Sequence, residues 1–267
     1  GTVRAQAIAG WVKTKKEIPL LQPNEEEKQR RFVLYGKGLM KDINSTFKPL
    51  EGERREAVEG QVARGEIELA DIIVYALQPL KVELSAAVAG LGVRLFREEE
   101  RMMYTGSYNI GAEGHLVSEM LEPASSAELA AERSRRFWLE FTTTADTPPG
   151  LHEGTLTIRA AGRNVVLPVR VSVLAAELRS DPVRKFGTFL RSSTTNRPLM
   201  KKMLADLKRA GRDVIVVGGG MKLTYDQSRD EIGVELAWLR DLCEDLREAG
   251  LRGPIIFGSY GAMTRQI

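Results

Sequence analysis

The spacing of apolar residues changes near residue 180, and this change most restricts what the chain can fold into. Between residues 60 and 178, short runs of branched and aromatic residues alternate with polar residues and are separated by turn residues. A period of two is typical of strands that bury one face of a sheet. After Asp181-Pro182 the period becomes 3.6 in two segments that lie between short apolar runs. The sequence therefore predicts two domains of different class.

The first domain is predicted to be an antiparallel β-sandwich over residues 60–180. Its clearest strands are Ile67–Leu77, Lys81–Val88, Phe137–Thr143, Gly154–Ala160 and Val165–Val173. The last two flank Ala161–Asn164, which supplies the glycine and asparagine that a hairpin loop favours, so we expect them to pair. Pro168 cannot donate a ladder hydrogen bond and is expected at an edge or a bulge. Residues 1–59 are weakly periodic and are predicted to add irregular loops and two or three strands to the sandwich.

Residues 183–267 alternate between short apolar runs and segments with helical spacing. The apolar runs are Phe186–Leu190, Val214–Val217 and Pro254–Phe257, and the helical segments are Pro198–Ala210 and Val234–Ala249. Strands and helices in alternation build a parallel sheet through crossover connections. The whole chain is therefore predicted to be an α+β protein of more than one domain.

Composition excludes several classes of protein. Hydrophobic residues make up 43% and charged residues 28% of the 267 residues, which is typical of a folded chain. The 39 Lys and Arg residues are interspersed with 36 Asp and Glu residues and leave a net charge of +3, so nucleic acid is not an expected partner. No apolar run reaches the roughly 18 residues of a membrane span, and residues 1–10 lack the pattern of a signal peptide. The single cysteine excludes an internal disulfide.

Four local features suggest chemistry, and a structural role is favoured for each. Gly218–Gly220 follow an apolar run, but their spacing matches no nucleotide-binding motif. His115 and His152 lie apart from any cysteine or carboxylate pattern, so no metal site is predicted. Cys243 falls on the apolar face of the second helical segment and is predicted to be a small core residue. Trp138 alternates with strand neighbours and is expected to anchor the sandwich core. No cofactor is expected.

Four phrases occur in a fixed order along the first domain and its turns. They are Ala63–Glu68 (ARGEIE), Phe137–Phe141 (FWLEF), Thr147–Gly150 (TPPG) leading to Gly154–Ile158 (GTLTI), and Leu167–Val173 (LPVRVSV). In this order they resemble the β-sandwich domain that precedes the catalytic barrel in proteins similar to glycoside hydrolase family 123. The resemblance extends from residue 60 to residue 267.

The resemblance implies that the sandwich is followed by a (β/α)₈ barrel, a TIM barrel, of which residues 183–267 are the first three β/α units. Active sites of such barrels lie at the carboxyl ends of the strands. The candidate substrate-binding residues are therefore Arg191, Ser192, Gly219, Asp226, Ser259 and Tyr260. The implied reaction is hydrolysis of an N-acetylhexosamine linkage, in which an adjacent Asp-Glu pair assists. Asp230-Glu231 is such a pair, but it precedes a predicted helix instead of ending a strand, so the catalytic residues stay unassigned.

Two hypotheses from different classes follow. In the first, the chain is the amino-terminal portion of a secreted glycoside hydrolase-like protein, extracellular or periplasmic, which acts on amino-sugar-containing glycans and whose continuation completes the barrel. In the second, it is a non-catalytic structural or glycan-binding β-sandwich protein. Its α/β segment then packs against another copy as a homo-oligomer, because three parallel strands expose two sheet edges. A glycan or oligosaccharide is the expected ligand.

Overall fold

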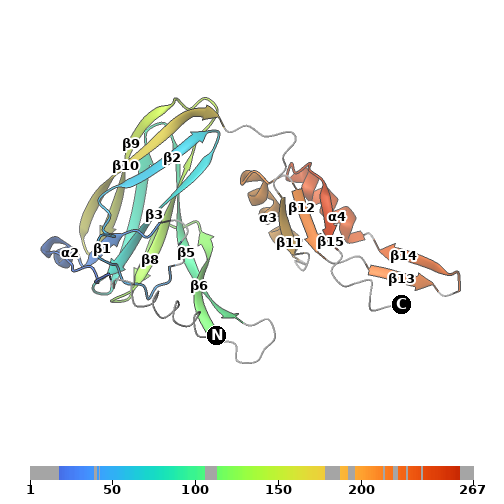
Figure 1. The fold of residues 1–267 in the computed structure, drawn as a ribbon, viewed down its shortest axis with the longest axis horizontal. Helices are drawn as coiled ribbons and strands as arrows, with labels where there is room; N and C mark the ends of the chain where they lie inside the picture. The colour runs from blue at the N-terminus through green and yellow to red at the C-terminus, as the bar shows by residue number, and fades with distance from the viewer. Residues whose placement is uncertain are drawn as a thin grey trace, which may run out of the picture. The chain divides into compact units, whose positions relative to one another are not determined.

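The computed structural model shows the chain as two compact units, which are described separately. Unit 1 is Gly1–Leu178 and unit 2 is Arg179–Ile267. In Figure 1, unit 1 runs from blue to yellow and unit 2 from orange to red. The structure describes residues 18–38, 41, 43–105, 113–177, 187–191, 196–212, 214–218, 222–226, 228–235 and 237–258.

The described residues of unit 1 form two five-stranded sheets (Figure 1). The first sheet has the order β1-β3-β8-β5-β6, with strands Phe32–Tyr35, Ile67–Ala76, Ser134–Thr142, Gly92–Thr105 and Glu113–Glu122. The second has the order β2-β10-β9-β4-β7, with strands Val58–Arg64, Arg163–Glu177, Gly150–Ala160, Leu80–Val88 and Ser126–Leu129. Neighbouring strands are antiparallel, apart from β2 and β10, which run parallel. The prediction of a mainly antiparallel β domain is confirmed.

One hydrophobic core lies between the inner faces of these sheets. Phe137, Leu139 and Phe141 alternate along β8 and are fully buried, as are Leu156 and Ile158 on β9. Because they come from different sheets and belong to one cluster, the sheets pack face to face as a sandwich. Burying each such side chain contributes about 1.5–3 kcal/mol.

Trp138 is not part of this core. It lies between Phe137 and Leu139 on β8, and side chains alternate along a strand, so it points to the outer face of the first sheet, where it is half-buried. The expectation that Trp138 anchors the sandwich core is therefore wrong.

The predicted hairpin is formed by β9 and β10. Ala160 pairs with Arg163, so the loop is the two residues Ala161-Gly162, with φ of 50° and 73°. Two left-handed residues are the mark of a tight turn that matches the twist of the strands. The loop is shorter than the four residues predicted, because Arg163 and Asn164 belong to the ladder.

Pro168 does not lie on an edge strand, because β10 runs between β9 and β2. It pairs with Thr155 of β9, whereas pairing with β2 begins one residue later, at Val169 and Val58. β10 as a whole is an interior strand, but Pro168 lies just outside the ladder with β2, so the expected edge position is confirmed for this residue. Proline has no backbone N–H, and at Pro168 no hydrogen bond to β2 is needed.

The amino-terminal part of unit 1 covers the outer face of the first sheet. Here α2, Glu25–Arg30, precedes β1. The described residues between 36 and 57 follow β1, and we call them the strap. Ile43 of the strap packs in a second cluster with Val33, Tyr35 and Ile73, which alternate with inward-facing residues on β1 and β3. The first sheet is thus buried on both faces over this region.

Unit 2 contains a parallel sheet in the order β11-β12-β15. Its elements are β11 Gly187–Arg191, α3 Arg197–Arg209, β12 Val214–Gly218, β13 Lys222–Asp226, β14 Glu231–Glu235, α4 Ala237–Glu248 and β15 Ile255–Gly258. Leu190 and Ile215 share one cluster with Leu204 of α3 and Leu246 of α4, so both helices pack on the same face of the sheet.

The second helical segment starts later than predicted. Residues 231–235 form β14, which pairs antiparallel with β13, and α4 begins at Ala237. The sequence had indicated a loop followed by a helix from Val234. The described strands of unit 2 form an open sheet, and no barrel is closed by them. No helix among the described residues is long and apolar enough to cross a membrane.

Candidate functional site

The carboxyl ends of the three parallel strands meet at one edge of the unit 2 sheet. Arg191 ends β11 and is in register with Gly218 at the end of β12, which is in register with Gly258 at the end of β15. We call these three residues the carboxyl edge. The loops that carry ligand contacts in parallel α/β sheets leave from this edge.

The β13–β14 hairpin is inserted in the chain between β12 and α4. Asp226 ends β13 and pairs with Glu231, the first residue of β14, so both flank the turn of the hairpin. Asp230 lies in that turn with φ of 52°. The adjacent Asp230-Glu231 pair therefore sits at the tip of a hairpin and not at the end of a parallel strand.

The structure places two of the six predicted substrate-binding residues. Arg191 belongs to the carboxyl edge, and Asp226 lies near the tip of the hairpin. The other four residues lie outside the part of the chain that the structure describes. They are Ser192, Gly219 and Ser259, which directly follow the residues of the carboxyl edge in sequence, and Tyr260. Binding by these six residues stays a prediction.

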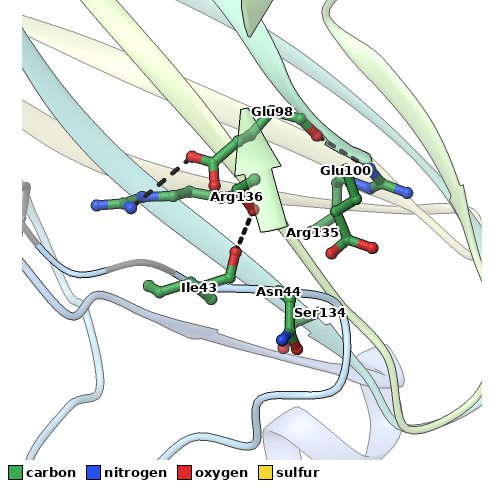
Figure 2. Close-up of a pocket in the computed structure, with 8 residues that line it drawn as sticks. Ile43, Asn44, Glu98, Glu100, Ser134, Arg135 and Arg136 are labelled. Carbon is green, nitrogen blue, oxygen red and sulfur yellow. Dashed lines mark hydrogen bonds and ion pairs between the residues drawn. The ribbon is translucent and has the colours of Figure 1, made fainter. Parts of the chain in front are cut away.

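A second candidate is a buried polar cluster on the outer face of the first sheet of unit 1. Asp71 of β3 is in register with Trp138 of β8, and Arg136 lies two residues before Trp138, on the same face. Glu98 of β5 approaches from the other side. Asp71, Glu98 and Arg136 are 5%, 7% and 4% exposed. We call these three residues the Arg136 clamp (Figure 2 shows Arg136 and Glu98).

The Arg136 guanidinium joins both carboxylates. Its Nε and Nη2 lie 3.0 and 2.8 Å from Asp71 Oδ2, and its Nη1 lies 3.7 Å from Glu98 Oε2. Trp138 Nε1 donates to the same Glu98 oxygen at 2.6 Å. The guanidinium carbon also lies 4.1 Å from the centroid of the Trp138 ring, which is a cation–π contact.

The same guanidinium holds the strap. Its Nη1 donates to the Lys41 carbonyl and its Nη2 to the Gly38 carbonyl, both at 2.9 Å. Arg136 is therefore bonded on every side, and it cannot take an anionic ligand without releasing either the strap or a buried carboxylate.

A second set of bonds fixes the strap further along. The Ser45 amide and hydroxyl donate to the Glu100 carboxylate, and Ser134 Oγ donates to the Phe47 carbonyl at 2.7 Å. Since the Ser134 proton is used there, the Tyr35 hydroxyl donates to Ser134 Oγ, also at 2.7 Å. Burial raises the pKa of Tyr35 well above its ordinary value of 10, which keeps this donor protonated.

A small cavity adjoins the clamp (Figure 2). Its lining residues are Ile43, Asn44, Glu98, Glu100, Ser118, Ser134, Arg135 and Arg136. Its volume of about 10 Å³ is room for one water molecule and is far too small for a sugar ring. The geometry therefore assigns the Arg136 clamp a structural role: it fastens the strap to the sheet.

Of the other side chains considered for chemistry, His152 has structural partners. His152 Nδ1 and Nε2 lie 2.7 and 2.8 Å from the carbonyl oxygens of Ala89 and Pro148, so the ring joins the β4–β5 turn to the β8–β9 loop. Cys243 of α4 is half-buried. Among the described residues, no group of three or more His, Cys, Asp and Glu side chains could hold a metal ion.

Sequence reasoning did not single out Asp71, Glu98 or Arg136. Charged residues in a period-two pattern are normally assigned to solvent, and this assignment failed here. One signal was present: Ile72–Ala76 (IIVYA) is a continuous apolar run, which is typical of a strand buried on both faces. A covered outer face requires partners for any charge that lies on it.

Comparison with known proteins shows a similarity of fold. No protein-family model and no curated protein matches the chain. Among solved structures, it is similar to a family 123 glycoside hydrolase from Clostridium perfringens, studied for glycolipid glycan hydrolysis, with a TM-score of 0.61 and 9% identity. The match covers 75% of this chain and 43% of that enzyme. The resemblance to this family is therefore supported at the level of the fold.

Two further structures match at TM-scores too low to carry an argument. The CooA pilin subunit from enterotoxigenic Escherichia coli has a TM-score of 0.29 and 6% identity, covering 54% of this chain and 97% of the subunit. A FixG-related protein from Vibrio parahaemolyticus has a TM-score of 0.26 and 4% identity, covering 40% of this chain and 78% of that protein.

Proposed function

We propose that this chain is the amino-terminal portion of a glycoside hydrolase-like, carbohydrate-active protein that works outside the cell or in the periplasm. Its substrates are glycans that contain amino sugars, such as the glycan of a glycolipid. The observation that carries the proposal is the fold similarity to the family 123 enzyme at a TM-score of 0.61. That match covers 75% of the 267 residues, about 200, which exceeds the 178 residues of unit 1.

The topology of unit 2 supports this reading. Unit 2 has three parallel strands in sequential order, and both connecting helices lie on one face of the sheet. A (β/α)₈ barrel begins with the same arrangement. A doubly wound sheet, by contrast, places helices on both faces. In the proposed protein, further β/α units complete the barrel beside β15.

The proposal gives the carboxyl edge, together with Asp226 of the β13–β14 hairpin, the task of binding sugar. A guanidinium such as that of Arg191 can donate to sugar hydroxyls, and a carboxylate such as that of Asp226 can accept from them. Ser192, Gly219, Ser259 and Tyr260, which follow the strand ends in sequence, are proposed to contact the same sugar. No residue of this chain is assigned as the general acid, since Asp230-Glu231 is at a hairpin tip. In unit 1, the Arg136 clamp keeps the outer face of the first sheet closed.

Hydrolysis is tested with the protein made from the complete gene. It is incubated with glycolipid glycans and oligosaccharides that end in N-acetylgalactosamine or N-acetylglucosamine, and the released sugar is measured. We expect release of an N-acetylhexosamine from at least one member of the panel. No release from any member, by a protein that is folded by circular dichroism, contradicts the proposal.

The site is tested separately by variants of the same protein. Arg191→Ala and Asp226→Ala are each expected to lower kcat/KM about 10- to 100-fold, because each removes a charged hydrogen bond to substrate. Arg159→Ala, at an exposed position of β9, is the matched control. Equal activity of all three variants argues against the carboxyl edge as the binding site.

A further inference from the structure

His152 lies at one end of the sandwich core of unit 1. It is on β9, four residues before the fully buried Leu156, so its side chain points between the two sheets. Its partner on β10 is Val171, which is buried in the same core. The imidazole therefore ends the row of inward-facing side chains on β9.

Two connections between the sheets close over this ring. The β4–β5 turn, residues 89–91, leads from the second sheet to the first, and the β8–β9 loop, residues 143–149, leads back. His152 Nδ1 lies 2.7 Å from the Ala89 carbonyl oxygen, and Nε2 lies 2.8 Å from the Pro148 carbonyl oxygen. A Cβ at Gly90 would lie 3.2 Å from Nδ1, so the turn is packed directly against the ring.

The two carbonyl oxygens determine which form of the ring can bind both connections. A carbonyl oxygen only accepts hydrogen bonds, whereas a neutral imidazole has one N–H donor and one acceptor nitrogen. Each nitrogen of His152 must therefore carry a proton to make a hydrogen bond at these distances. Only the imidazolium has both protons. In the neutral ring, one lone pair faces a carbonyl oxygen and repels it.

The elements around the ring offer it no carboxylate. The β4–β5 turn has no charged residue, and the β8–β9 loop has one, Asp146, which is exposed. Glu153 alternates with His152 along β9 and so faces away from the core. Burial and the charge of Glu66 raise the pKa of Glu68 on the inner face of β3, with no contribution from His152. Among the ion pairs of the described residues, none includes His152.

We propose that His152 is a pH-sensitive latch, which fastens both connections as the imidazolium and releases the β8–β9 loop when it loses one proton. The turn stays in place because it has a second tie, the hydrogen bond from the Ala89 N–H to the Glu153 carbonyl at 3.1 Å. Among the described hydrogen bonds, the Pro148 carbonyl has His152 as its one partner, and Pro148 and Pro149 have no N–H to donate. The inference is independent of the glycan function proposed above.

The two ring protons are observed by NMR of the whole chain. The sequence contains two histidines, so His115→Gln leaves His152 as the single imidazole, and labelling with ¹⁵N-histidine reports on each of its nitrogens. Since histidine changes charge between about pH 5 and pH 8, we expect both nitrogens to be protonated at the lower value and Nδ1 alone at the higher. A ring that keeps both protons at the higher pH, or a neutral ring protonated on Nε2, overturns the proposal.

Release of the loop is measured by amide hydrogen exchange, corrected for the intrinsic effect of pH. The Thr147 N–H, bonded to the Thr144 carbonyl at 3.1 Å, reports on the loop, and the Ala89 N–H reports on the turn. Over the same pH range we expect protection of Thr147 to fall about threefold or more, the equivalent of one lost hydrogen bond, while protection of Ala89 stays constant.

The two histidines provide matched variants for this measurement. His152→Gln is expected to remove the pH dependence at Thr147, and His115→Gln, on β6 of the other sheet, is expected to keep it. Circular dichroism at both pH values verifies that each variant is folded. Constant protection of the loop in the unaltered chain, equal loosening of loop and turn, or a pH dependence that persists in His152→Gln each overturns the proposal.

Discussion

At the scale of single residues, Arg136 connects three parts of unit 1. Its guanidinium bonds Asp71 of β3, faces Glu98 of β5 and donates to two carbonyl oxygens of the strap. Only arginine presents a planar set of donors that can serve all of these directions at once. Without it, Asp71 and two strap carbonyls lose this donor, and Glu98 retains the hydrogen bond from the Trp138 indole.

We predict that Arg136→Met lowers the free energy of unfolding by about 3–5 kcal/mol, because it leaves buried charges uncompensated. Urea unfolding followed by circular dichroism measures the loss. Arg159→Met on the exposed face of β9 is the control and is expected to change stability by no more than about 0.5 kcal/mol. If Arg136→Met lowers the free energy of unfolding by less than about 1 kcal/mol, the structural role of the Arg136 clamp is contradicted.

Glu27 is a second buried charge at this scale. It is 1% exposed, caps α2 through the Asn24 amide at 2.8 Å, and accepts from Arg54 Nε at 2.8 Å. Burial alone raises the pKa of Glu27, but the hydrogen bonds from Arg54 and from the Asn24 backbone outweigh it. The pKa of Glu27 therefore lies below its ordinary value of 4.5.

This lowered pKa predicts a pH-dependent stability. A carboxyl whose pKa is lower in the folded chain stabilises the fold above its unfolded pKa, and it loses that contribution as the pH falls through its folded pKa. The difference in unfolding free energy between the unaltered chain and Glu27→Gln is therefore expected to be full at neutral pH and to shrink below pH 4.5. Urea titrations at several pH values measure it, and a difference that is constant with pH contradicts the assignment.

At the scale of elements, the packing of β9 against β4 depends on a missing side chain. A Cβ at Gly154 would lie 2.0 Å from the Ala87 carbonyl oxygen and 2.6 Å from Val88 Cα. Both are backbone atoms of the paired strand, so neither can rotate away. Gly154 is thus an interior residue of β9 that allows a close approach, and not the start of a strand as the sequence had indicated.

We predict that Gly154→Ala destabilises unit 1 by about 3 kcal/mol or more, since a paired strand must shift to admit the methyl group. Gly60→Ala is the matched control, because a Cβ there meets nothing nearer than the Phe141 ring at 3.5 Å. We expect the control to change stability by less than about 1 kcal/mol. Similar losses for both variants in urea unfolding would contradict this reading.

Strong periodicity made five of the ten described strands of unit 1 predictable. The β9–β10 hairpin and the strands β3, β4 and β8 lie where alternation placed them, because each buries one face in the sandwich core. The short α2 was missed, since six residues cannot show a helical period. Its signal was local: Asn24 and Glu27 form a capping box, a pattern of cap and third residue that sequence alone contains.

The polar sites were less predictable than the fold. The carboxyl edge followed from the alternation of strand and helix, because parallel strands end on the same side. The Arg136 clamp depends on contacts between residues far apart in the chain, such as Arg136 with Gly38. The spacing of apolar residues along the sequence does not predict such a pair.

At the scale of the whole molecule, the two units have separate cores. The described clusters of unit 1 contain no residue of unit 2, and the cluster of unit 2 contains none of unit 1. Separate cores favour separate cooperative transitions, because each unit buries its own apolar residues.

We therefore predict two transitions in calorimetry of the whole chain. Arg136→Met is expected to lower the midpoint of one, and Leu204→Ala the midpoint of the other. Leu204 is fully buried in unit 2, and its truncation costs about 2–5 kcal/mol. A single transition that moves with either variant would show that the units unfold together.

The contact between Arg136 and Trp138 also gives the chain an optical reporter. The emission of an indole depends on the charges and the solvent around it, and here the indole donates to Glu98 beneath a guanidinium that holds the strap. Detachment of the strap would free that guanidinium and expose the Trp138 indole to water. With Trp11 and Trp238 replaced by phenylalanine, Trp138 is the single remaining tryptophan, and its fluorescence follows attachment of the strap without any added label.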